Sequence, residues 1–232
     1  MIGRTFGQHA LPTTFGLRVA QWLVSTSADI DEIRGARSNL PVQLGAAVGT
    51  GAGLGPEPLA VLECFARELS LRVPTLPWHT DRTPIRQSVN AASGMAATLA
   101  KVASDLIVLS QTEIGEVSIR PGGSSAVEGK RNPIDAIRAV AAEQVCAAMA
   151  ASTRPHPLDR ASGPWHAEWM TLPFVFQTAG AALEAVVRAV ASLEADTDAM
   201  GRRIDGEIDD STLRSAVTFI DRALTEWEGV RG

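Results

Sequence analysis

The stretch from Thr83 to about Val117 most constrains the fold, because its apolar residues recur at steps of three or four. This spacing places them on one face of a long α-helix. Thr83 and Pro84 suit the start of that helix, since threonine caps a first turn and proline lacks only an amide hydrogen that would go unused. The apolar positions are Ile85, Val89, Ala92, Ala96, Leu99, Ala103, Leu106 and Leu109.

The rest of the chain also has helical patterning. No segment alternates with period two, so no strand is predicted. Helices of roughly 30 residues pack lengthwise, which predicts an all-α bundle. We expect residues 1–172 to form a central bundle domain with active-site loops and 173–232 to complete the bundle. Further helices are expected over about 13–34, 57–71, 132–151, 174–195 and 211–230, with loops at 35–56, 73–82, 120–131 and 153–173.

Composition excludes several functional classes. The net charge of −5 over 232 residues argues against a nucleic-acid surface, which is normally basic. No uninterrupted apolar run reaches the roughly 18 to 20 residues of a membrane span, and no signal segment opens the chain. Cys64 and Cys146 are interpreted as reduced core thiols, since no motif supports a disulfide or a catalytic thiol. We therefore expect a cytoplasmic protein with neither nucleic-acid nor membrane partners.

The glycine-rich loop at residues 122–133 carries the strongest candidate chemistry. It presents Ser124 beside a second serine and is followed by Lys130 and Asn132. A serine on such a loop, with cations and amide donors nearby, suits removal of a proton next to a carboxylate. Two structural alternatives remain open. Gly-Gly-Ser-Ser is also common linker composition, and Asn132 is also suited to be the N-cap of the next helix.

This loop resembles the signature loop of the fumarase/aspartase superfamily, Gly-Ser-Ser-x-Met-Pro-x-Lys-x-Asn-Pro. Pro-Trp-His-Thr-Asp-Arg and Gly-Pro-Trp-His-Ala-Glu-Trp resemble one branch of it, the bacterial 3-carboxy-cis,cis-muconate cycloisomerases. Four further blocks occur in the order typical of the superfamily, at residues 3–16, 45–50, 77–82 and 158–169.

The resemblance implies an all-α homotetramer whose active sites combine blocks from different subunits. It implies interconversion of 3-carboxy-cis,cis-muconate and 4-carboxymuconolactone in protocatechuate catabolism. In this reaction a carboxylate adds within the molecule and the resulting carbanion is protonated. No metal or redox cofactor is implied, and the four histidines have no metal-ligand spacing.

The resemblance also assigns roles to individual residues. Ser124 corresponds to the catalytic base and acid, and its ionised form would need the loop amides and Lys130. A tricarboxylate substrate needs several cations, although a solvated surface charge is the alternative for any one arginine. His166 is interpreted as a packed core histidine. The candidate substrate-binding residues are Lys130, Asn132, Arg160, Arg4, His79 and Arg82.

Two positions depart from the superfamily pattern. Phe6 stands where many of its lyases have a histidine, which argues against adenylosuccinate or argininosuccinate cleavage. Val127 and Glu128 replace Met-Pro, and an inward Glu128 would oppose ionisation of Ser124.

Family members also carry an N-terminal domain ahead of the Gly-Arg-Thr block with which this chain opens. Two alternatives to the cycloisomerase follow. One is a truncated, catalytically impaired paralogue acting as a helical assembly partner. The other is a lyase that eliminates from another dicarboxylate or succinyl substrate.

Overall fold

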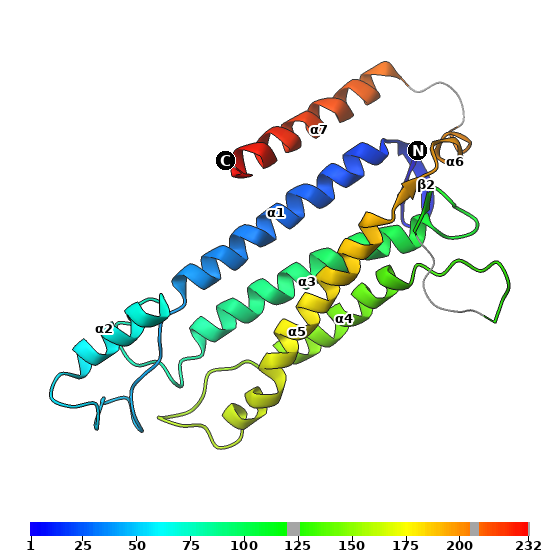
Figure 1. Cartoon of the computed structure of the whole chain (residues 1–232). Coiled ribbons are helices and arrows are strands. Elements are labelled where there is room, and N and C mark those ends of the chain that lie inside the picture. Colours follow the sequence, from blue (N-terminus) through cyan, green and yellow to red (C-terminus); the bar gives the residue numbers. More distant parts are fainter. Residues whose placement is uncertain (120–125, 205–208, 232) are drawn as a thin grey trace. The chain divides into compact units, whose positions relative to one another are not determined.

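The computed structural model describes residues 1–119, 126–204 and 209–231, which form mainly helices (Figure 1). This confirms the helical fold class expected from the spacing of apolar residues. The described helices are α1 Phe15–Asn39, α2 Pro58–Leu69, α3 Thr83–Leu109, α4 Ile134–Ala150, α5 Pro164–Ala191, α6 Thr197–Gly201 and α7 Asp210–Arg231. The described strands are β1 Ile2–Thr5, β2 Gln8–Pro12, β3 Val117–Ser118 and β4 Glu194–Ala195.

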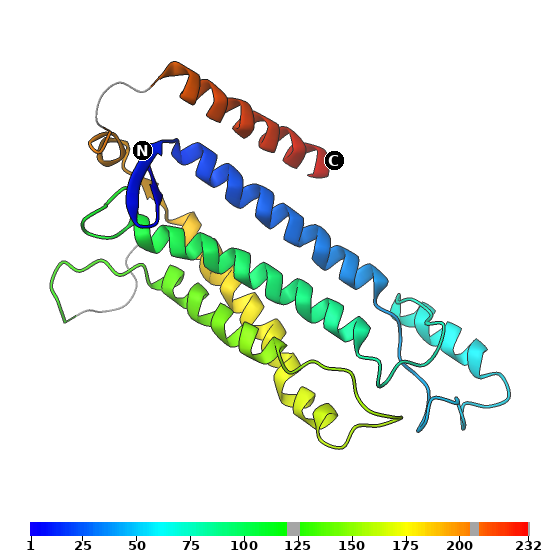
Figure 2. The same ribbon diagram turned by 180° about the vertical axis from the view of Figure 1, so that it is seen from behind.

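The prediction that the chain has no strands is wrong. β1 and β2 pair antiparallel, with Thr5 opposite Gln8, through a loop of Phe6 and Gly7 (Figure 2). Both loop residues have positive φ, 50° and 74°, as a tight two-residue hairpin turn requires. These strands are too short for alternation to stand out, and a phenylalanine seldom takes the left-handed conformation.

Several helix boundaries differ from expectation, beginning with α1, which was expected to end at about residue 34 and extends to Asn39. The helix expected over 83–117 ends at Leu109, and Gly115 at φ 56° leads into β3, which pairs with β4. The helix expected from residue 174 instead begins at Pro164 and contains Pro173. An internal proline removes one hydrogen bond of the helix, usually at a cost of about 3 kcal/mol, but packing can override that preference.

The described chain forms two compact units, each built from separate segments. The first unit comprises residues 1–28, 98–141 and 182–232, and the second comprises 29–97 and 142–181. This partition differs from the domain division at residue 172, which stays a prediction.

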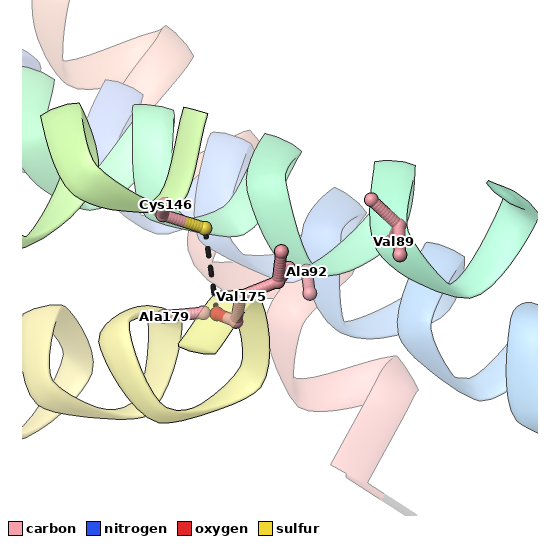
Figure 3. Packing of buried hydrophobic residues seen from close by; sticks show 6 residues of the cluster. Val89, Ala92, Cys146, Val175 and Ala179 are labelled. Carbon is pink, nitrogen blue, oxygen red and sulfur yellow. Dashed lines mark hydrogen bonds between the residues drawn. The ribbon is translucent and has the colours of Figure 1, made fainter. Parts of the chain in front are cut away.

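The core of the second unit joins α3, α4 and α5 (Figure 3). Small side chains bring these helices close together, and the buried Cys146 thiol donates a hydrogen bond to the Val175 carbonyl at 3.5 Å. Burial raises the pKa of this thiol, as expected for a packed cysteine. The buried members are Val89, Ala92, Ala96, Cys146, Val175 and Ala179.

In the first unit, α7 lies along the N-terminal part of α1 (Figures 1 and 2). Gly16 faces Ile220 there, at a distance that leaves little room for a larger side chain. Trp22 of α1 donates a hydrogen bond to Asp105 of α3 at 2.8 Å. A buried tryptophan with its ring nitrogen satisfied fixes the register of these two helices.

Two helices, α3 and α5, are long and apolar enough on average to span a membrane, although neither contains an uninterrupted apolar run of that length. Both also supply the buried core described above. Core helices of soluble proteins satisfy the same criterion, so this property carries no conclusion about a membrane.

Candidate functional site

A buried ion pair anchors the part of the second unit that holds most of the sequence-predicted cations. Arg82, one residue before α3, donates from Nε and Nη2 to the two carboxylate oxygens of Glu168 on α5, at 3.3 and 2.5 Å. The Glu168 residue is 1% exposed and Arg82 6%. Arg82 is therefore a neutralised cation, neither a solvated surface charge nor a free anion-binding group.

His156 packs against the same carboxylate. Its Nε2 lies 3.3 Å from Glu168 Oε1, within ion-pair range but outside hydrogen-bond geometry. Its backbone amide donates to the Thr80 carbonyl at 3.0 Å, which ties the 153–163 loop to the 77–82 loop. Because neither ring nitrogen has a hydrogen-bond partner among the described residues, we interpret the contact as packing rather than a formal salt bridge.

Arg160 is held differently, by neutral groups alone. Its Nη2 donates to the Ala46 carbonyl at 3.1 Å, and its Nη1 lies 3.3 Å from His79 Nε2. The guanidinium also lies 5.3 Å from the centre of the Trp165 ring, in cation–π range. Arg160 is exposed, and within the described ranges no carboxylate lies at ion-pair distance from it. Its charge thus remains available to an anion.

His79 supports this guanidinium rather than adding a second charge. Its ring packs edge-on against Trp165 at 4.8 Å between centres. Burial, followed by the nearby Arg160 charge, lowers the pKa of His79 below the ordinary value of a histidine. The ring is then neutral at pH 7, so that Nε2 is able to accept from Arg160.

Arg4 lies in the first unit and is also neutralised. It makes a bidentate pair with Glu116, Nη1 to Oε2 at 2.8 Å and Nη2 to Oε1 at 3.0 Å. Glu116 is fully buried, at 0% exposure. Like Arg82, Arg4 already has a carboxylate partner, and it anchors β1 to the segment that precedes β3.

Lys130 and Arg131 line a hollow of about 1020 Å³ in the first unit. The same hollow is lined by Glu113, Glu194 and Asp196. With three carboxylates and two cations the charged side chains of this lining are net negative, so the hollow as a whole does not favour an anion. Binding of a substrate carboxylate here would therefore depend on Lys130 itself, which is exposed.

Asn132 lies two residues before α4 and is half-buried. Its backbone carbonyl accepts from the Ile134 amide at 2.8 Å. Since α4 begins at Ile134, Asn132 stands one residue too early to be the N-cap. Glu128 is exposed. The predicted proton-transfer residue, Ser124, lies outside the described residues.

Glu168 and His156 were not predicted from the sequence, and the prediction that His166 is a buried histidine is wrong. His166 is exposed, whereas His156 has a side chain only 1% exposed. Glu168 belongs to the Gly-Pro-Trp-His-Ala-Glu-Trp block. Its position four residues after Pro164 in that block was the sequence feature that could have identified it. Among the described residues, no group of three histidine, cysteine or acidic side chains is close enough to hold a metal ion.

Comparisons with known proteins agree with these blocks. A family model described as lyase matches residues 1–147. The 3-carboxy-cis,cis-muconate cycloisomerase of Bradyrhizobium diazoefficiens is 37% identical over 230 residues, 94% of this chain and 50% of that protein. The nitrosuccinate lyase of Streptomyces davaonensis is 37% identical over 225 residues, 88% of this chain and 46% of that protein.

A solved structure shows the same relationship. The β-carboxy-cis,cis-muconate cycloisomerase from Acinetobacter calcoaceticus is 32% identical with a TM-score of 0.78, covering 87% of this chain and 46% of that one. This chain spans about half the length of the curated relatives it matches. The family model, the identities and the fold agree, and the chain belongs to the fumarase/aspartase superfamily of lyases.

Proposed function

We propose that this chain is a cycloisomerase that interconverts 3-carboxy-cis,cis-muconate and 4-carboxymuconolactone. The observation that carries the proposal is the Arg160 guanidinium, which is fixed by His79, Ala46 and Trp165 without a carboxylate partner. Such a group is preorganised for an anionic substrate, because binding requires no existing ion pair to break. The similarity to a cycloisomerase of Bradyrhizobium diazoefficiens supports this choice of anion.

The chemistry assigns a distinct task to each group. In lactone formation a substrate carboxylate oxygen adds across the conjugated double bond. The electron pair moves to the carbon next to another carboxylate, and Ser124 delivers a proton to that carbon. In the reverse direction Ser124 removes that proton, while Arg160 and Lys130 stabilise the enolate-like negative charge.

The candidate binding residues belong to two different compact units: Lys130 and Asn132 to the first, Arg160 and His79 to the second. We propose that the working enzyme is a homotetramer in which subunits share each active site, as the superfamily resemblance implies. We also propose that it works in the cytoplasm.

Ultraviolet absorbance of 3-carboxy-cis,cis-muconate tests the reaction directly. Wild-type protein should remove the conjugated diene absorbance. Ser124→Ala should reduce turnover by about 10²–10⁴-fold, the range expected for general acid–base catalysis. Circular dichroism and light scattering should show unchanged helicity and assembly. Turnover that survives Ser124→Ala would make the assignment of proton transfer wrong.

A second function is favoured by one observation, since the nitrosuccinate lyase of Streptomyces davaonensis is as similar in identity, at 37%. The same groups suit β-elimination from a dicarboxylate, in which Ser124 removes a proton and the group on the neighbouring carbon leaves. Inactivity toward 3-carboxymuconate, together with release of fumarate from a substituted succinate, would favour this lyase.

A further inference from the structure

The side chain of Arg82 joins two elements that both contact Arg160. Its Nε and Nη2 bind Glu168 on α5, while its Nη1 donates to the backbone carbonyl of His79 at 3.0 Å. A guanidinium held at two nitrogens by one carboxylate has a fixed plane, so its remaining nitrogen points in one direction. Glu168 thus determines where Arg82 can hold the His79 backbone.

The contacts continue from His79 to the anion-binding group. His79 Nε2 contacts Arg160 Nη1, and the His79 ring packs on Trp165. Trp165 and Glu168 are three residues apart on α5, which puts them on neighbouring positions of one helix face. Trp165 also carries Arg160 over its ring.

We infer that Glu168 is a positioning residue: through Arg82 and His79 it sets the place of the Arg160 guanidinium. Glu168 itself is buried, at 1% exposure, so its effect on Arg160 is transmitted through the other two side chains. His156 packs on the Oε1 side of the carboxylate and restricts its movement. The inference rests on the proposed role of Arg160 in binding the substrate anion.

An NMR titration of His79 in Glu168→Gln separates positioning from a simple charge effect. The Glu168 charge raises the pKa of His79, while burial and the Arg160, Arg82 and His156 charges lower it. Loss of the Glu168 charge alone would therefore lower that pKa further. Release of His79 from its burial and from Arg160 would instead raise it toward the ordinary histidine value. We expect a rise; a fall or no change would overturn the inference.

The second readout is anion binding, measured by calorimetry with propane-1,2,3-tricarboxylate. Misplacement of a charged hydrogen-bond donor should weaken binding by about tenfold or more. Asp105→Asn makes the same acid-to-amide change on a carboxylate of the first unit that accepts from Trp22 and Lys101. This control should leave both the His79 pKa and the affinity unchanged.

Because Glu168→Gln leaves the buried Arg82 charge unpaired and threatens the fold, Glu168→Asp is the second variant. It retains the charge but is one methylene shorter, so it cannot hold Arg82 in the same plane. A raised His79 pKa and weaker tricarboxylate binding in Glu168→Asp support positioning, and wild-type values contradict it. The proposed function would be wrong if wild-type protein neither binds the tricarboxylate nor consumes 3-carboxymuconate. In that case the His79 titration would still test whether Glu168 positions His79.

Discussion

At the scale of single residues, the arginines differ in what balances their charge. Arg4 and Arg82 each bind a buried glutamate through two nitrogens, whereas Arg160 is held by a ring nitrogen, a carbonyl and an aromatic face. Breaking either buried pair would strand a charge away from water, so those arginines support structure. Arg160 can meet an incoming carboxylate without such a loss.

Arg160→Gln should therefore raise KM for 3-carboxymuconate by about 10–100-fold, since hydrogen bonds to charged groups contribute about 1.5–3 kcal/mol. Arg34→Gln is the matched control, because Arg34 is an exposed arginine that pairs with its helix neighbour Asp31. Steady-state kinetics of both variants measure the difference. Equal KM values for the two variants would contradict the role of Arg160.

His79 should also make stability depend on pH. Its folded-state pKa is lowered, so below the ordinary histidine value the unfolded chain binds a proton that the folded chain does not. The free energy of unfolding should then fall as pH drops from the ordinary pKa toward the folded one. The His79→Gln variant should lack this part of the pH dependence. Urea unfolding of both proteins at several pH values measures the difference. Identical pH profiles would contradict the shifted pKa.

The sequence singled out Arg4, Arg82 and Arg160 as candidate binding cations but did not predict how each is paired. Arg82 and Glu168 are 86 positions apart, and no local spacing reports a contact that tertiary packing creates. The interpretation of His166 as a packed core histidine was wrong for the same reason. Two flanking tryptophans suggested burial of His166, but the first turns of α5 leave it exposed.

At the scale of elements, the start of α3 is held by Asp81. Its Oδ1 accepts from the Thr83 amide at 3.1 Å and from the Thr83 hydroxyl at 2.6 Å. These bonds, that of the Thr83 hydroxyl first, lower the pKa of Asp81 below its ordinary value. The stabilisation is therefore present above the ordinary aspartate pKa and is lost as pH falls through the lowered folded value.

Asp81→Ala should reduce the free energy of unfolding by about 1 kcal/mol near neutral pH, the usual net contribution of a hydrogen bond. Below the folded pKa of Asp81 the difference from wild type should shrink. Asp31→Ala, on an exposed helix face, is the control. A pH-independent difference would show that the Asp81 carboxylate charge is not what holds the α3 start.

The packing of α4 predicts how the two thiols react. Cys146 is buried between α4 and α5 with a raised pKa, whereas Cys64 on α2 is exposed. One thiol per chain should react rapidly with an aromatic disulfide reagent in native buffer, and both should react in denaturant. Cys64→Ser should remove the rapid phase. Rapid reaction of two thiols in native wild-type protein would contradict the packing.

The start of α3 and both ends of α7 agree with the sequence prediction to within one residue. The α5 start was missed because Pro173 favours a helix boundary by local preference, while the chain places it inside the helix. The hairpin was missed because two strands of four and five residues give too few alternations to identify.

At the scale of the whole molecule, exposed apolar side chains predict self-association. They follow α5 and α7 in the described chain and include Phe174, Phe176, Leu183, Val187, Val217 and Phe219. Apolar surface of this extent usually marks a protein interface. Multi-angle light scattering should report a species heavier than one chain, and a stable monomer at micromolar concentration would contradict shared active sites.

The buried Arg82–Glu168 pair also restricts which substitutions can accumulate at these two positions during evolution. Replacing either partner alone strands a charge in the interior, a loss of about 3–5 kcal/mol that is a large fraction of an ordinary domain's stability. Selection should therefore remove substitutions at one position alone, and the two positions should change only together. Among descendants of this sequence, residues 82 and 168 should behave as one inherited character.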